Sequence, residues 1–340
     1  MKKTICSLAP RSGERVRVRG AFETHGFQPR PLTPALSPTL WGRGSALVGA
    51  LFFISIAAAP QKKMDDTPVM SWDEVQNLPM PAAGRRIAYG PELQQFGELR
   101  LPKGKGPFAV VVLVHGGCWL DAYDYSYITR LADRIAQLGA ATWTIEYRRL
   151  GDPGGGWPGT FLDVAKATDH LRELLRDYPL DLARVVTVGH SAGGQLALWL
   201  AARGKLPKDS ALYTPRPLRI KGVIGLAAIT DLHSYRVGAP GSCNASVDRL
   251  LGGTPQQQPR RYAETSPLAL LPLTVPQWFI QGGRDPIVPA ASVRKYVEAA
   301  RKKRERVKLL VQPAAGHFET AVPDSVTWAD LKAALTEALN

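Results

Sequence analysis

Residues 185–200, VVTVGHSAGGQLALWL, constrain the fold more than any other part of the 340-residue chain. The stretch opens with strand-forming residues and closes with an apolar pattern of helical spacing, which predicts a strand that turns abruptly into a helix. Gly189, Ala192 and Gly193 are small, as such a turn requires, because larger side chains would collide with the neighbouring strand and helix. The pattern therefore predicts that Ser191 is strained and exposes its hydroxyl above a sheet. The positive N-terminal end of the helix would face the same hydroxyl.

From residue 86 onward the chain alternates strand and helix signals. This alternation predicts a three-layer α/β/α sandwich with a mostly parallel sheet. The expected strands are 97–102, 108–117, 140–149, 184–191, 220–232, 275–285 and 306–319, and the expected helices are 125–139, 160–178, 192–204, 292–304 and 327–339.

Residues 232–268 do not fit the alternation. They are rich in Gly, Pro and Gln, with only a short helical piece. An insertion of this length in a compact domain is typical of a functional lid. We therefore expect the insertion to line part of a ligand pocket.

The first sixty residues have the features of a leader. Residues 46–60 form a signal-peptide-like segment, in which an apolar run follows Arg43 and ends in small residues, with cleavage expected after Ala57 or Ala59. A short membrane anchor or a buried helix is the alternative. Residues 1–45 are expected to lie outside the folded domain, either disordered or upstream of a true start near residues 42–48. Residues 61–85 are interpreted as a linker.

This leader predicts an exported protein, periplasmic or secreted, if it is cleaved, and a cytoplasmic protein otherwise. No apolar run reaches the roughly 18–20 residues that a membrane-spanning helix needs, so no stable membrane span is expected in the mature form.

The formal net charge of +14 raises the possibility of nucleic-acid binding. The first 60 residues contribute eight Lys/Arg against two Asp/Glu, and much of the remaining excess lies in residues 301–308, RKKRERVK. Such a run is typical of the solvated end of a helix. It has no interleaved aromatic residues on which bases could stack, so we exclude nucleic acid as a partner.

Three cysteines are present, Cys6, Cys118 and Cys243. Their spacing fits neither a metal site nor a CxxC redox pair, and no metal or cofactor is expected. If the leader is removed, Cys118 and Cys243 remain. Because nothing in their spacing indicates pairing, we expect two free thiols.

A serine hydroxyl is a poor nucleophile at neutral pH, so Ser191 needs a base, and that base needs an orienting acid. After a strand–serine–helix turn the partners follow in the order serine, acid, histidine, each at the end of a later strand. Two histidines follow Ser191. His317 comes just after the last expected strand and is the predicted base, whereas His233 lies in the insertion and is assigned a surface role.

The predicted acid is Asp285, which directly follows the penultimate strand in a loop stiffened by two prolines. Asp231, after the preceding strand, is the alternative. Glu319 and Asp324 come too late in the order. His190, beside Ser191, is expected to pack under the turn rather than to titrate in a reaction.

The sequence HGGCW at residues 115–119 follows a buried strand, where two glycines would let the main chain approach a ligand. We expect the backbone N–H groups of Gly117, Cys118 and Ala192 to stabilise a negatively charged oxygen. A backbone donor needs no particular side chain, so Cys118 is not expected to act as a nucleophile.

Together these motifs resemble the α/β-hydrolase superfamily, and within it the group of hormone-sensitive-lipase-like esterases, bacterial feruloyl-esterase-like proteins and kynurenine formamidases. The similar segments are HGGCW, EYRRL with FLDV, GHSAGGQLA, GGRDPIVP and GHFE, within residues 97 to about 335. The resemblance implies a catalytic domain at residues 86–340 and metal-free hydrolysis of esters or aryl formamides. It places the nucleophile on Ser191, the acid on Asp285 and the base on His317, with oxyanion amides at Gly117 and Cys118.

The chain also departs from that group. Hormone-sensitive-lipase-like members usually have a third glycine where Cys118 stands, which makes HGGxW proteins the better comparison. The insertion at 232–268 matches no part of the family pattern.

The predicted function is hydrolysis of carboxylic esters with small or medium acyl or aryl groups, through an acyl-enzyme and without a cofactor. The expected partner is a small-molecule ester or amide. One alternative is an arylformamidase that acts on N-formylkynurenine-type substrates, although an exported location argues against it. The other is a non-catalytic binding module with the hydrolase fold.

Overall fold

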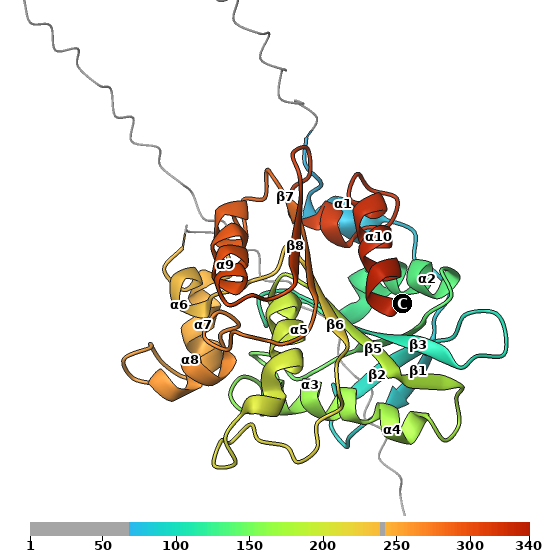
Figure 1. The fold of residues 1–340 in the computed structure, drawn as a ribbon, viewed down its shortest axis with the longest axis horizontal. Coiled ribbons are helices and arrows are strands. Elements are labelled where there is room, and N and C mark those ends of the chain that lie inside the picture. The colour runs from blue at the N-terminus through green and yellow to red at the C-terminus, as the bar shows by residue number, and fades with distance from the viewer. Residues whose placement is uncertain (1–67, 239–241) are drawn as a thin grey trace, which may run out of the picture. The chain divides into compact units, whose positions relative to one another are not determined.

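The computed structural model describes residues 68–238 and 242–340. Within them an eight-stranded sheet has the order β1-β2-β4-β3-β5-β6-β7-β8 (Figure 1). β1 pairs antiparallel with β2, and β2 with β4, whereas every other neighbouring pair is parallel. The strands are β1 (Arg85–Ala88), β2 (Phe96–Arg100), β3 (Phe108–Val114), β4 (Ala141–Ile145), β5 (Leu180–His190), β6 (Gly222–Leu226), β7 (Gln277–Gly282) and β8 (Val307–Gln312).

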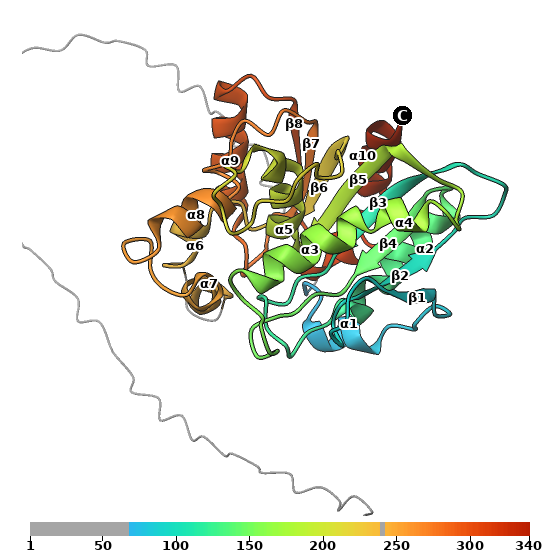
Figure 2. The same cartoon turned by 90° about the horizontal axis from the view of Figure 1, so that it is seen from below.

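Helices cover both faces of the sheet, as Figures 1 and 2 show. One apolar core joins the sheet to α3, α5 and α9, and a second joins its other face to α1, α2 and α10. The α-helices are α1 (Trp72–Asn77), α2 (Thr129–Gln137), α3 (Gly159–Asp169), α4 (Leu171–Leu174), α5 (Ala192–Ala202), α6 (Leu232–Tyr235), α7 (Asn244–Leu251), α8 (Pro259–Thr265), α9 (Ala290–Lys302) and α10 (Trp328–Leu339). Short 3-10 turns occur at Tyr125–Ile128, Arg203–Lys205 and Phe318–Ala321.

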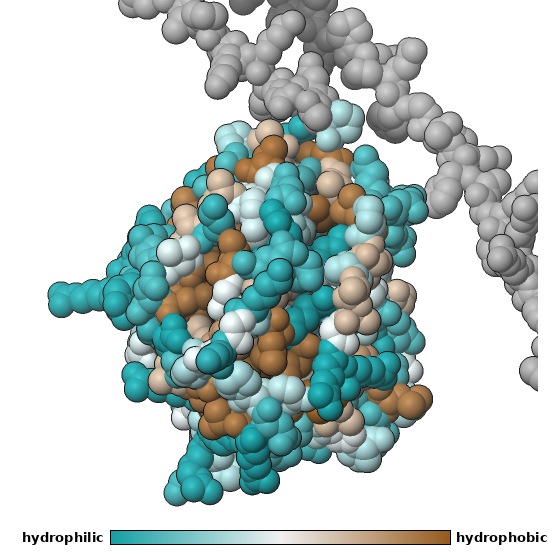
Figure 3. All heavy atoms as spheres, turned by 90° about the vertical axis from the view of Figure 1, so that its right-hand side faces the viewer, coloured by the Kyte–Doolittle hydropathy of each residue, from teal (hydrophilic) through white to brown (hydrophobic). Residues whose placement is uncertain are grey.

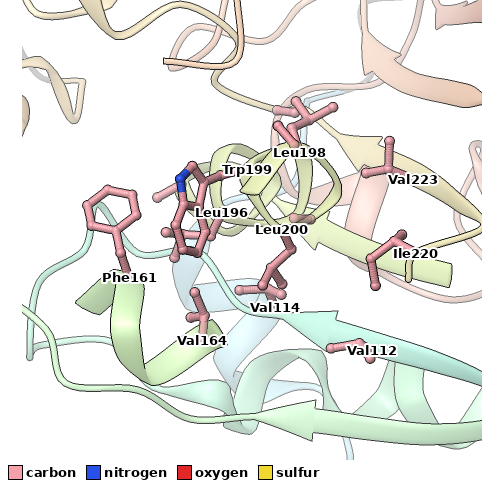
Figure 4. Packing of buried hydrophobic residues seen from close by; sticks show 14 of the residues in the cluster. Val112, Val114, Phe161, Val164, Leu196, Leu198, Trp199, Leu200, Ile220 and Val223 are labelled. Carbon is pink, nitrogen blue, oxygen red and sulfur yellow. The ribbon is translucent and has the colours of Figure 1, made fainter. Parts of the chain in front are cut away.

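The central strands are buried on both faces, and this is why they read as continuous apolar runs rather than as an alternation. In β3 the side chains of Val112 and Val114 are fully buried. Figure 4 shows them beneath Leu200 of α5, with Phe161 of α3 close to Trp199. The rings of Phe161 and Trp199 make an edge-on contact with centroids 5.2 Å apart. Large side chains therefore hold α3 and α5 against each other and against the central strands of the sheet.

The expected fold class is confirmed, and each expected strand and helix has a counterpart. The expected helix at 160–178 is divided into α3 and α4. The described part of the insertion contains three helices, α6, α7 and α8, where the sequence predicts only a short helical piece. They form a group on the same side of the domain as α9 in both ribbon views. β1 was not predicted, because a four-residue, mostly exposed edge strand carries no long apolar pattern.

Of residues 61–85, interpreted as a linker, the part from residue 68 contains α1 and leads into β1. Ser71 and Glu74 form a capping box that starts α1, and Val75 is buried in the second core. The predictions for residues 1–60, including the signal segment, lie outside the described residues. Within the described ranges the structure contains no helix that is long and apolar enough to cross a bilayer. On the face shown in Figure 3, hydrophobic residues are interspersed among hydrophilic ones.

Candidate active site

Ser191 stands at the turn between β5 and α5, as predicted. Its backbone has φ 57° and ψ −120°, a conformation that side-chain-bearing residues rarely adopt. A Cβ on Gly189 would lie 2.1 Å from the carbonyl oxygen of Gly193, and a Cβ on Gly193 would lie 2.2 Å from that of Val114. Only glycine fits at either position, so these two residues allow the sharp turn that presents Ser191.

His317 and Asp285 are brought together from the loops after β8 and β7. His317 Nδ1 lies 2.8 Å from Asp285 Oδ2, and both side chains are buried. The other carboxylate oxygen accepts the backbone N–H groups of Ile287 at 2.8 Å and Val288 at 2.9 Å. These bonds hold the carboxylate in place. Because Nδ1–H donates to it, Nε2 of the imidazole carries the free lone pair.

A cavity of about 250 Å³ contains the predicted nucleophile, the predicted base and the HGGCW loop. Asp285 lies behind His317, away from the cavity wall, and Ala192 is buried at the start of α5. The cavity is lined by Trp72, Gly117, Cys118, Tyr123, Tyr127, His190, Ser191, Cys243, Ile287, His317 and Phe318.

The HGGCW loop has an unusual backbone. Gly117, Cys118 and Trp119 all have positive φ, at 94°, 57° and 57°. A Cβ on Gly117 would lie 2.2 Å from the Cβ of Tyr123, so that position requires glycine. Neither Gly117 nor Cys118 donates its backbone N–H to another residue of the described ranges. Both residues line the cavity.

Buried side chains support the loop from below. His115 Nε2 lies 2.8 Å from Glu146 Oε1, and the hydroxyl of Tyr147 donates to the carbonyl of His115 at 2.8 Å. Trp119 Nε1 donates to Gln195 Oε1 of α5 at 3.2 Å. The loop is thereby fixed to the segment that directly follows β4 and to the helix that follows Ser191.

The expectation of two free thiols is wrong. Cys118 and Cys243 form a disulfide, with Cα atoms 4.9 Å apart and 125 residues between them in sequence. Cys243 caps α7 within the insertion, which folds back onto the HGGCW loop. Spacing alone does not reveal such a pair, because only the fold brings the two segments together. Native disulfides typically contribute about 2–5 kcal/mol, so the bridge is a firm attachment of the insertion to the loop.

His190 packs under the turn, as expected, and it also links three parts of the site. The hydroxyl of Tyr127 accepts the N–H of Gly116 at 2.7 Å, so its own hydrogen points to His190 Nδ1, 2.8 Å away. His190 Nε2 then donates to the carbonyl of His317 at 3.2 Å. Burial, with a further contribution from His317, holds the pKa of His190 well below 6.5. The ring is therefore neutral at physiological pH.

This buried neutral imidazole predicts a pH dependence of stability. Below pH 6.5 the unfolded chain binds a proton at His190 that the folded chain does not, so the free energy of unfolding decreases as the pH falls. Between pH 7 and pH 5 this contribution amounts to about 2 kcal/mol. We expect His190→Asn, which cannot take up that proton, to lose about 2 kcal/mol less than the wild type over this range. Urea unfolding at both pH values measures the difference, and parallel losses in both proteins would contradict it.

The residues considered as alternatives to Asp285 and His317 do not line this cavity. The carboxylate of Asp231 accepts the backbone N–H of His233 at 3.1 Å and the hydroxyl of Ser234, and so caps α6. The ring of His233 lies against Tyr262, with centroids 4.9 Å apart, in the insertion. Glu319 accepts backbone N–H groups of Met70 and Gly316.

Five residues of the cavity wall were not predicted from the sequence. Ile287 belongs to the acid loop and Phe318 to the histidine loop, so their position next to motif residues is a signal that could have indicated them. Tyr123, Tyr127 and Trp72 have no such signal. The residues concerned are Trp72, Tyr123, Tyr127, Ile287 and Phe318.

Comparison with known proteins agrees with this fold and identifies a class of enzymes with which the chain shares sequence. A family model described as BD-FAE matches residues 98–299, more than half of the chain. Esterase LipC of Mycobacterium tuberculosis is 25% identical over 280 residues, which cover 78% of this chain and 69% of LipC. Esterase LipQ of the same organism is 25% identical over 201 residues, 56% of this chain and 45% of LipQ. The chain thus spans less than half of the length of LipQ.

A kynurenine formamidase, avaC of Aspergillus versicolor, is 34% identical over 131 residues, which cover 34% of this chain and 43% of that protein. Among solved structures, a truncated carbohydrate esterase from gut microbiota has a TM-score of 0.65 at 18% identity, covering 76% of this chain and 96% of that one. Esterase B from Lactobacillus rhamnosis also has a TM-score of 0.65 at 18% identity, with 75% and 83% covered. These structural likenesses concern the fold alone.

The BD-FAE match contains the HGGCW loop, Ser191 and Asp285, and it ends before His317. Together with the sheet order and the strand–serine–helix turn, this match settles the family. The chain belongs to the BD-FAE family of esterases with the α/β-hydrolase fold.

Proposed function

We propose that this chain is a serine hydrolase that cleaves carboxylic esters with small or medium acyl or aryl groups. The observation that carries the proposal is the buried contact between His317 and Asp285 at the cavity where strained Ser191 stands. Esterase names among the relatives support the same reaction class. In the proposed reaction His317 is the base that accepts a proton in each half-reaction and then gives it up.

In the first half-reaction the Oγ of Ser191 forms a bond to the ester carbonyl carbon while His317 Nε2 takes the hydroxyl proton. The carbonyl oxygen becomes negative and accepts hydrogen bonds from the N–H groups of Gly117, Cys118 and Ala192. Removing one such donor typically costs about 2.7–4 kcal/mol of transition-state stabilisation. When the carbon–oxygen bond of the ester breaks, His317 gives its proton to the leaving alcohol, and an acyl-serine remains.

In the second half-reaction His317 takes a proton from water, whose oxygen attacks the acyl-serine carbonyl. The bond to Ser191 breaks, the serine regains its proton from the imidazolium, and the carboxylic acid leaves. Asp285 holds the Nδ1–H tautomer and stabilises the imidazolium through both steps. The neutral ring of His190 adds no second positive charge beside it.

A fluorophosphonate probe tests this assignment directly. We expect one equivalent to bind covalently, with the modified peptide containing Ser191, and loss of p-nitrophenyl acetate turnover in proportion to labelling. Peptide mass spectrometry and residual activity on the same samples provide the measurement. Active protein that the probe does not label, or labels at another residue, would contradict the mechanism. Turnover of N-formylkynurenine but not of short esters would favour the formamidase alternative.

We also infer that the folded protein works in an oxidising compartment. The Cys118–Cys243 disulfide supports this, because structural disulfides persist in secreted and periplasmic proteins and are rare in the cytosol. The signal-like segment at residues 46–60 is consistent with export.

A further inference from the structure

An N-terminal arm, residues 68–84, contains α1, packs on the second apolar core and contributes Trp72 to the cavity wall. Two buried arginines of the domain hold its later part. Arg130 Nε donates to the carbonyl of Pro79 at 2.9 Å, and Arg100 Nη1 donates to that of Ala82 at 2.7 Å. These charged groups bind backbone atoms of the arm, and the buried side chain of Val75 adds an apolar contact, so the domain holds the arm at several points.

Glu319 attaches the beginning of the arm to the histidine loop. One carboxylate oxygen accepts the backbone N–H of Met70 at 2.7 Å, and the other accepts that of Gly316 at 3.0 Å. Glu319 is 8% exposed, and hydrogen bonds to a buried carboxylate are stronger than neutral ones. Val69 also contacts Gly316, where an added Cβ would lie 2.7 Å from the Cβ of Val69. The arm and the loop that carries His317 are therefore connected.

The arm places Trp72 in the cavity wall. The indole contacts Tyr123, Tyr127 and Phe318 with ring centroids 5.2, 5.4 and 5.6 Å apart, and it lines the cavity of Ser191. Its half-buried side chain gives the cavity an aromatic side. A ligand bound against that side would cover the rest of the indole.

We propose that Trp72 is a specificity-determining residue that contacts the apolar part of the ester, and that Glu319 is the positioning residue that holds it there. The proposal rests on the proposed esterase function. It assigns to Trp72 the preference for esters with bulky apolar groups over esters with small ones. An aromatic group of the substrate that packs against the indole face buries a large apolar area, whereas a methyl group covers only a small part of that face. Selectivity for larger apolar groups should therefore depend on residue 72.

The test compares Trp72→Ala with the matched variant Trp328→Ala. Trp328 is also half-buried and packs on the same core, but it does not line the cavity. For each protein the ratio of kcat/KM for phenyl acetate to that for methyl acetate, and for methyl phenylacetate to methyl acetate, is measured in a pH-stat. We expect at least one ratio to fall about tenfold in Trp72→Ala through a higher KM, and both ratios to stay at the wild-type values in Trp328→Ala.

Trp72→Phe, which keeps an aromatic face, is expected to recover part of the lost selectivity. It also keeps the proposal testable if the alanine variant does not fold. Ratios in Trp72→Ala and Trp72→Phe that equal those of the wild type would overturn the proposal. A wild type that hydrolyses none of the three esters overturns the proposed function instead, so the two failures are distinguishable.

The role of Glu319 is tested by a double-mutant cycle. Glu319→Gln loses one of two backbone bonds, and we expect it to reduce the same ratio as Trp72→Ala. If Glu319 acts through Trp72, the double variant should have the ratio of Trp72→Ala alone. Additive reductions would show that Glu319 acts by another route and would overturn its positioning role.

Discussion

Replacing Ser191 with alanine is expected to lower kcat for p-nitrophenyl acetate by about 10⁶-fold while the protein stays folded. The reason is chemical, because without Oγ no acyl-enzyme forms and only water can attack the ester. The backbone should tolerate the change, since alanine meets the same φ of 57° as serine and the side chain is 2% exposed. Steady-state kinetics and far-UV circular dichroism on the same preparation measure both parts.

The matched control is Ser126→Ala, an exposed serine in the 3-10 turn Tyr125–Ile128. Its activity should equal that of the wild type. A Ser191→Ala protein with wild-type turnover would remove the basis for the nucleophile, and a loss in both variants would indicate general damage rather than loss of chemistry.

Replacing Asp285 with asparagine is expected to lower kcat by about 10⁴-fold with little change in KM. Asparagine has nearly the same shape, so the backbone bonds from Ile287 and Val288 can persist. It cannot compensate an imidazolium, and its NH₂ group favours the wrong tautomer of His317. A base whose Nε2 carries the hydrogen cannot accept the proton of Ser191.

Asp231→Asn is the matched control, because Asp231 is the other carboxylate that follows a strand of the carboxyl half. Its carboxylate accepts bonds from α6 and, at 3.4 Å, from the hydroxyl of Ser266, and Lys295 lies 3.9 Å from it. We expect less than about a tenfold change in kcat, since the substitution weakens a helix cap, the long bond from Ser266 and a surface ion pair. If instead Asp231→Asn were inactive and Asp285→Asn active, the acid would have been assigned to the wrong strand end.

Most of the strands, and their mainly parallel pairing, could be predicted because the central strands are buried on both faces and follow one another with helices between them. The sharp turn at Ser191 could be predicted for a similar reason, since Gly189 and Gly193 have to be small whatever the neighbouring loops do. The positions of Asp285 and His317 followed from the rule that parallel strands end at the same edge. All of these signals are local in sequence.

The contacts that could not be predicted are those between distant segments. The Cys118–Cys243 bridge joins residues 125 positions apart, and Glu319 binds Met70 across a separation of 249. No periodic pattern in the sequence indicates either of these contacts. Their meeting depends on how the insertion and the N-terminal arm pack on a finished sheet.

The sequence by itself determined the layered fold, the strained serine and the loops that carry Asp285 and His317, because burial and backbone sterics act over a few neighbouring residues. Only the tertiary structure decided what surrounds the serine: the aromatic side with Trp72, the disulfide beside the HGGCW loop and the neutral His190 beneath it. These features arise where separate elements pack together, and packing geometry is a property of the whole domain rather than of any one segment.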